Sequence, residues 1–127
     1  MNQLKLLNKK IIISAAADGI GWAITKACMN QGAIVYISDK NNLALDKISK
    51  HNLFEKQFYL QSVNTNNIEE VENYFSKLKL KKIDALINNV GIAGPTGNLE
   101  NININDWKET IETNINSHFY FTKYSIP

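Results

Sequence analysis

The apolar positions of this chain alternate between continuous runs and helical spacing. Residues 11–13 are three isoleucines, a β-branched run that is typical of a strand buried on both faces. From Gly19 the apolar residues recur at intervals of three and four, which predicts a helix. Gly32 is expected to end that helix, because glycine favours the position just after a helix C-terminus. The apolar face of the helix is predicted to hold Ile20, Ala23, Ile24, Ala27 and Cys28.

The same change of period occurs three more times. Further strands are predicted over 33–38, 57–63 and 84–90, and a helix follows each of them. The last helix is expected to begin with Asn105 as its N-cap, and Asp106 then lies favourably against the positive end of the helix. The apolar stripe of this helix is predicted to consist of Trp107, Ile111, Ile115 and Phe119; the two helices before it hold Leu43, Leu45 and Ile48, and Ile68, Val71, Tyr74, Phe75 and Leu78.

Strand and helix therefore alternate four times, and this order determines the expected fold class. Continuous apolar strands separated by helices predict an α/β fold, in which one parallel sheet has helices on both faces. A chain of 127 residues is long enough for one domain with a buried core, and no linker or repeat divides it.

Composition and charge exclude several classes of function. The net charge of +2 is small and the 14 basic residues, all lysine, are scattered, so no nucleic-acid partner is expected. The single cysteine, Cys28, excludes an internal disulfide and a cysteine-cluster metal site, and no metal is expected. No apolar run approaches the roughly 18 residues of a membrane helix. The N-terminus imitates a signal peptide, but its apolar part is at the bottom of the usual length range and cleavage there would remove the first strand, so a cytoplasmic location is expected.

Four features that can bind a ligand lie where α/β sheets bind theirs, at the ends of the strands. Residues 14–21, Ser-Ala-Ala-Ala-Asp-Gly-Ile-Gly, open the first helix, where backbone N–H groups can hold a pyrophosphate. Asp39 ends the second strand, and its carboxylate can accept hydrogen bonds from both hydroxyls of an adenosine ribose. Residues 87–91, Ile-Asn-Asn-Val-Gly, leave the fourth strand. Asn114 lies inside the last helix, where asparagine is unfavourable unless its amide has a partner.

Together these features resemble the classical short-chain dehydrogenase/reductase family, over essentially the whole chain. The family's Thr-Gly-x-x-x-Gly-x-Gly turn matches residues 14–21, and its Asn-Asn-Ala-Gly matches residues 88–91. The resemblance implies a Rossmann-type doubly wound parallel sheet with strand order 3-2-1-4, incomplete here, and a nicotinamide dinucleotide as cofactor. The residues that it implies for cofactor binding are Ser14, Ala15, Ala17, Asp18, Gly19, Ile20, Gly21, Asp39, Ser62, Val63, Asn89, Val90 and Gly91.

Two carboxylates favour NAD over NADP as this cofactor. Asp18 and Asp39 stand where members of the family that use NADP often have a basic residue, and both would repel a 2′-phosphate. Lys40 is a weaker signal for NADP. Ser62 departs from the family, many members of which place an aspartate beside the adenine. Ala15 is tolerated in the turn if its φ is negative, whereas a positive φ would cost roughly 1 kcal/mol.

Of the family's catalytic residues, the chain has a counterpart only for the helix asparagine, Asn114. Family members also use a serine, and a tyrosine and lysine spaced Tyr-x-x-x-Lys on a later helix, for proton transfer beside the cofactor. The one such spacing here, Tyr36 to Lys40, falls on a predicted strand, where the two residues lie roughly 13 Å apart, so we reject it. We expect residues 1–127 to be the NAD-binding part, cut before the catalytic strand and helix, inactive alone and prone to aggregate through its open edge.

The favoured interpretation is an oxidoreductase that transfers hydride between NAD(H) and a small alcohol or ketone, whose identity the sequence does not reveal. The alternative, from a different class, is a non-catalytic NAD-binding module or pseudoenzyme. Another Rossmann-type enzyme, such as a methyltransferase, would leave residues 88–91 and Asn114 unexplained. The full-length form is expected to be a homo-oligomer through the long helix, 105–124.

Overall fold

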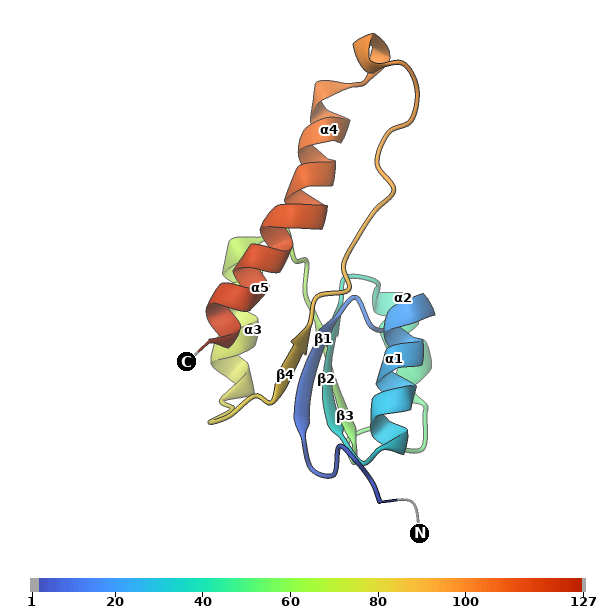
Figure 1. Cartoon of the computed structure of the whole chain (residues 1–127), viewed down its shortest axis with the longest axis vertical. Helices are drawn as coiled ribbons and strands as arrows, with labels where there is room; N and C mark the ends of the chain where they lie inside the picture. The colour runs from blue at the N-terminus through green and yellow to red at the C-terminus, as the bar shows by residue number, and fades with distance from the viewer. Residues whose placement is uncertain (1–2, 127) are drawn as a thin grey trace.

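The computed structural model describes residues 3–126, which form a four-stranded parallel sheet with helices on both faces (Figure 1). The expected strand order 3-2-1-4 is confirmed. The fourth strand is shorter than the predicted stretch 84–90, because beyond residue 87 the backbone bonds to side chains instead of to a neighbouring strand. The strands are β1 (Lys10–Ser14), β2 (Ile34–Asp39), β3 (Phe58–Ser62) and β4 (Ala85–Ile87).

The helices form one layer on each face of this sheet (Figure 1). On one face lie α1 (Gly19–Asn30) and α2 (Asn42–Ser49), and on the other α3 (Ile68–Leu78) and α5 (Ser117–Ser125). The long predicted helix consists of α4 (Ile104–Ile111), a π-helical turn (Glu112–Asn116) and α5 in direct succession, and a 3-10 turn (Leu99–Asn101) precedes it. The two apolar cores are built around Ile11, Ile13, Val35, Ile37 and Phe58, and around Ile12, Val63, Val71, Tyr74 and Phe121.

The first helix buries a different face from the one predicted. Gly21, Thr25 and Met29 face the sheet and are buried. A Cβ on Gly21 would lie 2.5 Å from the carbonyl oxygen of Ala15, so α1 approaches the preceding turn through its smallest residue. The hydroxyl of Thr25 donates to the Gly21 carbonyl oxygen at 2.9 Å, which satisfies it without water. Of the predicted face, Ile20 (75% exposed), Ala23 and Ala27 are exposed, and Ile24 and Cys28 are only partly buried.

The N-cap of the long helix also differs from the prediction. Asn103, not Asn105, caps α4, and its side-chain oxygen accepts hydrogen bonds from the N–H groups of Asn105 at 2.8 Å and Asp106 at 3.4 Å. Three asparagines alternate with isoleucines over 101–105, so residue type alone could not select the cap. Asp106 does lie in the first turn, as expected from the helix dipole.

The N-terminal part of the long helix extends beyond the sheet, together with the segment 88–103 (Figure 1). No residue of α4 is buried. The helical spacing of the predicted apolar stripe is confirmed, yet Trp107, Ile115 and Phe119 are 53, 58 and 63% exposed. Within residues 3–126, therefore, no other segment covers most of this stripe.

Two kinds of site are absent from the described part of the chain, residues 3–126. None of its helices is both long and apolar enough to cross a membrane. Nor does it hold a group of three or more His, Cys, Asp and Glu side chains that could bind a metal ion.

Candidate functional site

The turn between β1 and α1 presents an open helix N-terminus. Ala15 has a φ of +52°, so it adopts the left-handed conformation, which is costlier for a residue with a Cβ than a negative φ. Asp18 caps α1 with an oxygen that accepts from the N–H of Gly19 at 2.8 Å. A Cβ added to Gly19 would meet nothing within 4 Å, so the space in front of the first turn is free. An anion can therefore approach the positive end of α1.

Asp39 connects this turn to the ends of two further strands. One carboxylate oxygen accepts from the N–H of Ala17 at 3.1 Å, and the other from the N–H of Asn41 at 2.9 Å. The main-chain carbonyl of Asp39 accepts from the N–H of Val63 at 3.0 Å. Because each carboxylate oxygen has a second lone pair, Asp39 can still accept hydrogen bonds from a pair of ligand hydroxyls.

The segment that leaves β4 is bonded to the same turn. The N–H of Asn89 donates to the hydroxyl oxygen of Ser14 at 3.0 Å, and the Asn89 amide donates to the Ala15 carbonyl oxygen at 3.0 Å. Ser14 is 1% exposed, so its hydroxyl has a structural part in the turn. These bonds hold residues 14–15 and 89 in one layer at the carboxyl ends of β1 and β4.

The other side of this segment is bonded to the long helix. The Asn114 side chain accepts from the N–H of Ile92 at 2.8 Å and donates to its carbonyl oxygen at 2.9 Å. The Nε2 of His118 lies 2.7 Å from the carbonyl oxygen of Val90. Asn114 thus has the partners that its mid-helix position requires, and it lies in the π-helical turn, a feature frequent at functional sites.

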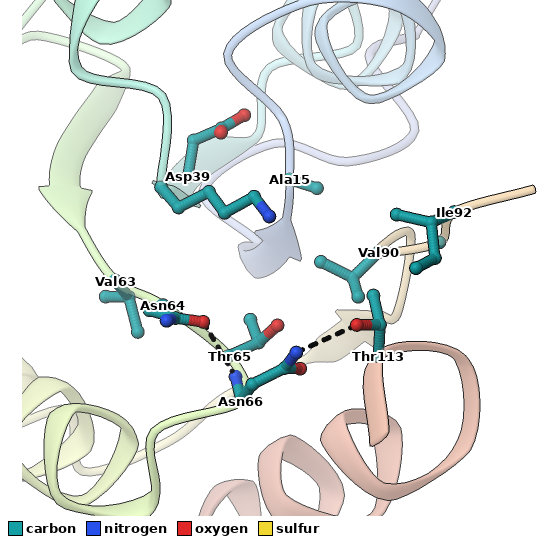
Figure 2. Close-up of a pocket in the computed structure, with 11 residues that line it drawn as sticks. Ala15, Asp39, Val63, Asn64, Thr65, Asn66, Val90, Ile92 and Thr113 are labelled. Atoms are coloured by element: carbon teal, nitrogen blue, oxygen red, sulfur yellow. Dashed lines mark hydrogen bonds between the residues drawn. The ribbon is translucent and has the colours of Figure 1, made fainter. Parts of the chain in front are cut away.

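A hollow of about 90 Å³ lies at the carboxyl ends of the strands, where these segments meet (Figure 2). Five of the residues expected to bind a cofactor line it: Ala15, Asp39, Val63, Val90 and Gly91. The others stand outside its lining, in the turn, in α1, or beside the strand ends: Ser14, Ala17, Asp18, Gly19, Ile20, Gly21, Ser62 and Asn89, together with Asn114 in the helix.

The polar floor of this hollow was not predicted from the sequence. Asn64, Thr65 and Asn66 come one residue after the end of β3 and line the hollow. The N–H of Asn66 donates to the Asn64 side-chain oxygen at 3.0 Å, and the Asn66 amide donates to the hydroxyl of Thr113 at 2.8 Å (Figure 2). Their place after a strand was a signal, but 18 asparagines in the chain made it uninformative. Ile92 and Thr113, which also line the hollow, were missed as well.

Tyr36 and Lys40, which were rejected as a catalytic pair, lie on a strand and at its end, as predicted. Tyr36 lies within β2, and its ring stacks on that of Tyr59 with 5.1 Å between centroids. Burial raises the pKa of Tyr36, and Tyr59 raises it further. A proton-transferring tyrosine beside a lysine needs the opposite shift. Lys40 does line the hollow, on the side of Asp39.

Sequence comparisons agree with this geometry. The family model described as short chain dehydrogenase matches residues 9–127. Meso-2,3-butanediol dehydrogenase of Serratia marcescens is 27% identical over 122 residues, which cover 94% of this chain and 48% of that protein. Cyclohexanol dehydrogenase of an Acinetobacter strain is 28% identical over 126 residues, which cover 97% of this chain and 50% of that protein. The chain spans about half the length of the curated relatives it matches.

Solved structures agree on the fold. The closed form of serine dehydrogenase complexed with NADP+ matches with a TM-score of 0.85 at 23% identity, over 93% of this chain and 48% of that one. Such an identity shows the fold alone. The Rossmann-type α/β arrangement expected from the sequence is thereby confirmed from a second direction.

Proposed function

Because the chain belongs to the short-chain dehydrogenase family, we propose that it binds a nicotinamide dinucleotide for an oxidoreductase acting on an alcohol or ketone. The observation that carries the proposal is the convergence of four strand ends on one hollow, with a carboxylate and an open helix N-terminus beside it. When bound, the nicotinamide accepts or donates the hydride. The protein's own groups bind and orient the cofactor and keep the substrate next to it.

Each part of the dinucleotide has a matching group in this proposal. Residues 14–21 hold the pyrophosphate at the N-terminus of α1, where Gly19 leaves open space. Asp39 accepts hydrogen bonds from the adenosine ribose. Ser62 and Val63 lie toward the adenine, and residues 89–91 contact the remainder of the cofactor. Asn114 is the one catalytic residue in the proposal: it supports a proton path by water, through the turn that it clamps to Ile92.

NAD is the cofactor that we propose, although serine dehydrogenase, a neighbour in fold, is complexed with NADP+. Asp39 and Asp18 both lie beside the turn, and a 2′-phosphate next to either carboxylate is repelled. Titration of the chain with NAD and with NADP, followed by calorimetry, tests the choice. Asp39→Asn should shift the ratio of the two dissociation constants toward NADP by roughly tenfold, since one negative charge is removed. Asp46→Asn, on the exposed side of α2, is the matched control and should leave the ratio unchanged.

Tighter binding of NADP than of NAD by the unaltered chain would show that Lys40 outweighs the two carboxylates. Failure of both dinucleotides to bind would remove the proposed function itself. NAD and NADP differ by a single phosphate, so a difference between their dissociation constants reports on the contacts of the protein with that phosphate.

The alternative is a non-catalytic module that binds NAD. Its support is that Asn114 alone of the catalytic set has a counterpart in these residues. We propose that the serine and the Tyr-x-x-x-Lys belong to protein outside the nucleotide-binding part, residues 1–127. The chain alone should then bind NAD but form no NADH with butane-2,3-diol or cyclohexanol, as measured by the absorbance of NADH. A longer form with these residues should turn over; binding without turnover in that form favours the module.

Association of two copies through the long helix, 105–124, is part of the same proposal. Its support is the exposed stripe of Trp107, Ile115 and Phe119. The expected cytoplasmic location also remains a proposal.

A further inference from the structure

A second hollow, of about 240 Å³, lies between α3 and the edge strand β3 and shares no lining residue with the hollow at the strand ends. Tyrosine residues line it from both the sheet and the helix. The lining includes Tyr36, Tyr59 and Gln61 from the sheet, and Tyr74, Lys77 and Leu78 from α3. The three helix residues are spaced by three and four positions, which places them on one side of α3.

The hydroxyl of Tyr74 lacks a hydrogen-bond partner. Tyr74 is 2% exposed, and its hydroxyl oxygen is buried without a partner among residues 3–126. Burial raises the pKa of Tyr74, and the neighbouring Tyr36 raises it further, so the hydroxyl keeps its proton. A buried polar group without a partner is unfavourable unless a ligand or a water completes it.

Lys77 decides which kind of ligand fits beside this hydroxyl. Of the described residues that line the hollow, it alone is charged. Its ammonium forms no ion pair within residues 3–126, and no Asp or Glu stands three or four positions away from it on α3. A hydroxyl can donate or accept, so Tyr74 by itself does not select a ligand. The positive charge does, because it attracts a carboxylate and repels an amine.

The sheet side of the hollow is aromatic. The rings of Tyr36 and Tyr59 stack with 5.1 Å between centroids and 17° between planes, and Tyr59 is 41% exposed, so this pair can take a further ring. We infer that the hollow binds a small aromatic carboxylate. Its ring packs on the tyrosine pair, and its carboxylate accepts a hydrogen bond from the Tyr74 hydroxyl beside the Lys77 ammonium. This site is separate from the proposed dinucleotide site and does not depend on it.

Calorimetric titration with benzoate tests the inference. The unaltered chain should bind benzoate more tightly than cyclohexanecarboxylate, which lacks the aromatic ring, by roughly 2- to 12-fold. Tyr74→Phe keeps the ring and removes the hydroxyl, so it should weaken benzoate by roughly tenfold or more, as expected for a hydrogen bond to a charged group. Lys77→Gln should weaken benzoate by roughly 2- to 5-fold and leave the affinity for benzyl alcohol, which is uncharged, unaltered.

Controls separate recognition from folding. Lys50→Gln removes a lysine beside α2, on the opposite face of the sheet, and should not change the affinity for benzoate. Tyr74→Phe should melt no lower than the unaltered chain, because it removes an unsatisfied buried group. Lys77 is exposed, so Lys77→Gln keeps the test valid if Tyr74→Phe fails to fold.

Three results contradict the inference. The first is that the unaltered chain does not bind benzoate. The second is that benzoate binds Tyr74→Phe or Lys77→Gln as tightly as the unaltered chain, which would place it elsewhere, such as at the open N-terminus of α1. The third is equal affinity for benzoate and cyclohexanecarboxylate, which would remove the aromatic part of the proposed ligand.

Discussion

Replacing Ala15 by glycine should stabilise the protein, although it removes a side chain. Ala15 has a φ of +52°, a left-handed conformation that costs a residue with a Cβ roughly 1–2 kcal/mol. Glycine adopts it freely, but loses about 0.5–1 kcal/mol through its greater freedom in the unfolded chain. The methyl group of Ala15 is only partly buried, so little apolar burial is lost. The expected net gain is about 0.5–1 kcal/mol in the free energy of unfolding.

The next residue provides a matched control. Ala16 is fully buried and does not have a positive φ. In Ala16→Gly the lost methyl burial of about 0.8 kcal/mol adds to the same entropic loss, so this variant should be destabilised by about 1.5 kcal/mol. Two identical substitutions at adjacent positions are thus expected to have opposite signs, separated by about 2 kcal/mol.

Urea unfolding of the three proteins measures this difference. The dependence of the unfolding free energy on urea should be equal in all three, so that the midpoints can be compared directly. A loss of stability in Ala15→Gly as large as in Ala16→Gly would refute the reasoning, because it would mean that the turn carries no backbone strain. A midpoint for Ala15→Gly above that of the unaltered chain supports it.

Three further predictions concern stability. Gly21→Ala should lose roughly 1–3 kcal/mol of stability, since its Cβ would lie 2.5 Å from the Ala15 carbonyl oxygen. Gly91→Ala, whose Cβ would have its nearest contact at 3.6 Å, should melt at the temperature of the unaltered chain. Equal melting temperatures of the two variants would contradict this prediction. Asn114→Ala leaves two backbone groups unpaired and should lose about 1 kcal/mol in urea unfolding, against no change for the exposed Asn105→Ala. The pKa of Asp84 is lowered in the folded protein, mainly by the hydrogen bond from the Lys10 N–H. The ionised Asp84 carboxylate therefore stabilises the fold fully above the pKa of an unfolded aspartate, about 3.9, and this stabilisation is lost as the pH falls through the lower pKa of the folded state. Asp84→Asn should therefore lose less stability than the unaltered chain between pH 5 and pH 3, and parallel curves would contradict this.

The sheet could be predicted because each strand is a continuous apolar run between turn residues. The face of α1 could not, because hydrophobic spacing counts apolar side chains and not the room between elements. Gly21 is buried for its lack of a side chain, since any Cβ there would meet the Ala15 carbonyl oxygen and the Asn89 amide. Ile20 is consequently turned outward, beside the open N-terminus of α1. The glycine motif therefore located the turn between β1 and α1 correctly, whereas the spacing of apolar residues assigned the wrong buried face to α1.

Half of the hollow could be predicted for a related reason. Asp39, Val63 and Gly91 stand at positions that the family motifs define, and all three line it. Thr65 and Asn66 belong to no motif, although both line the hollow, and the side-chain oxygen of Asn66 is buried without a hydrogen-bond partner among residues 3–126. A sequence lists donors and acceptors, but only the structure shows which of them are already paired.

The exposed stripe of the long helix shows a different limit. Its spacing correctly predicted a helix with an apolar face, because a period of four residues places Trp107, Ile115 and Phe119 on one side. The opposite side of α5 packs onto the sheet and α3 through Phe121, so the core inside the chain is already complete without the stripe. An apolar face that is not needed for the core of its own chain is explained most simply by contact with a second surface. Sedimentation of the chain tests this: Trp107→Lys and Phe119→Lys should reduce association without lowering the melting temperature, whereas a fall in melting temperature with unchanged association would place the stripe inside the fold.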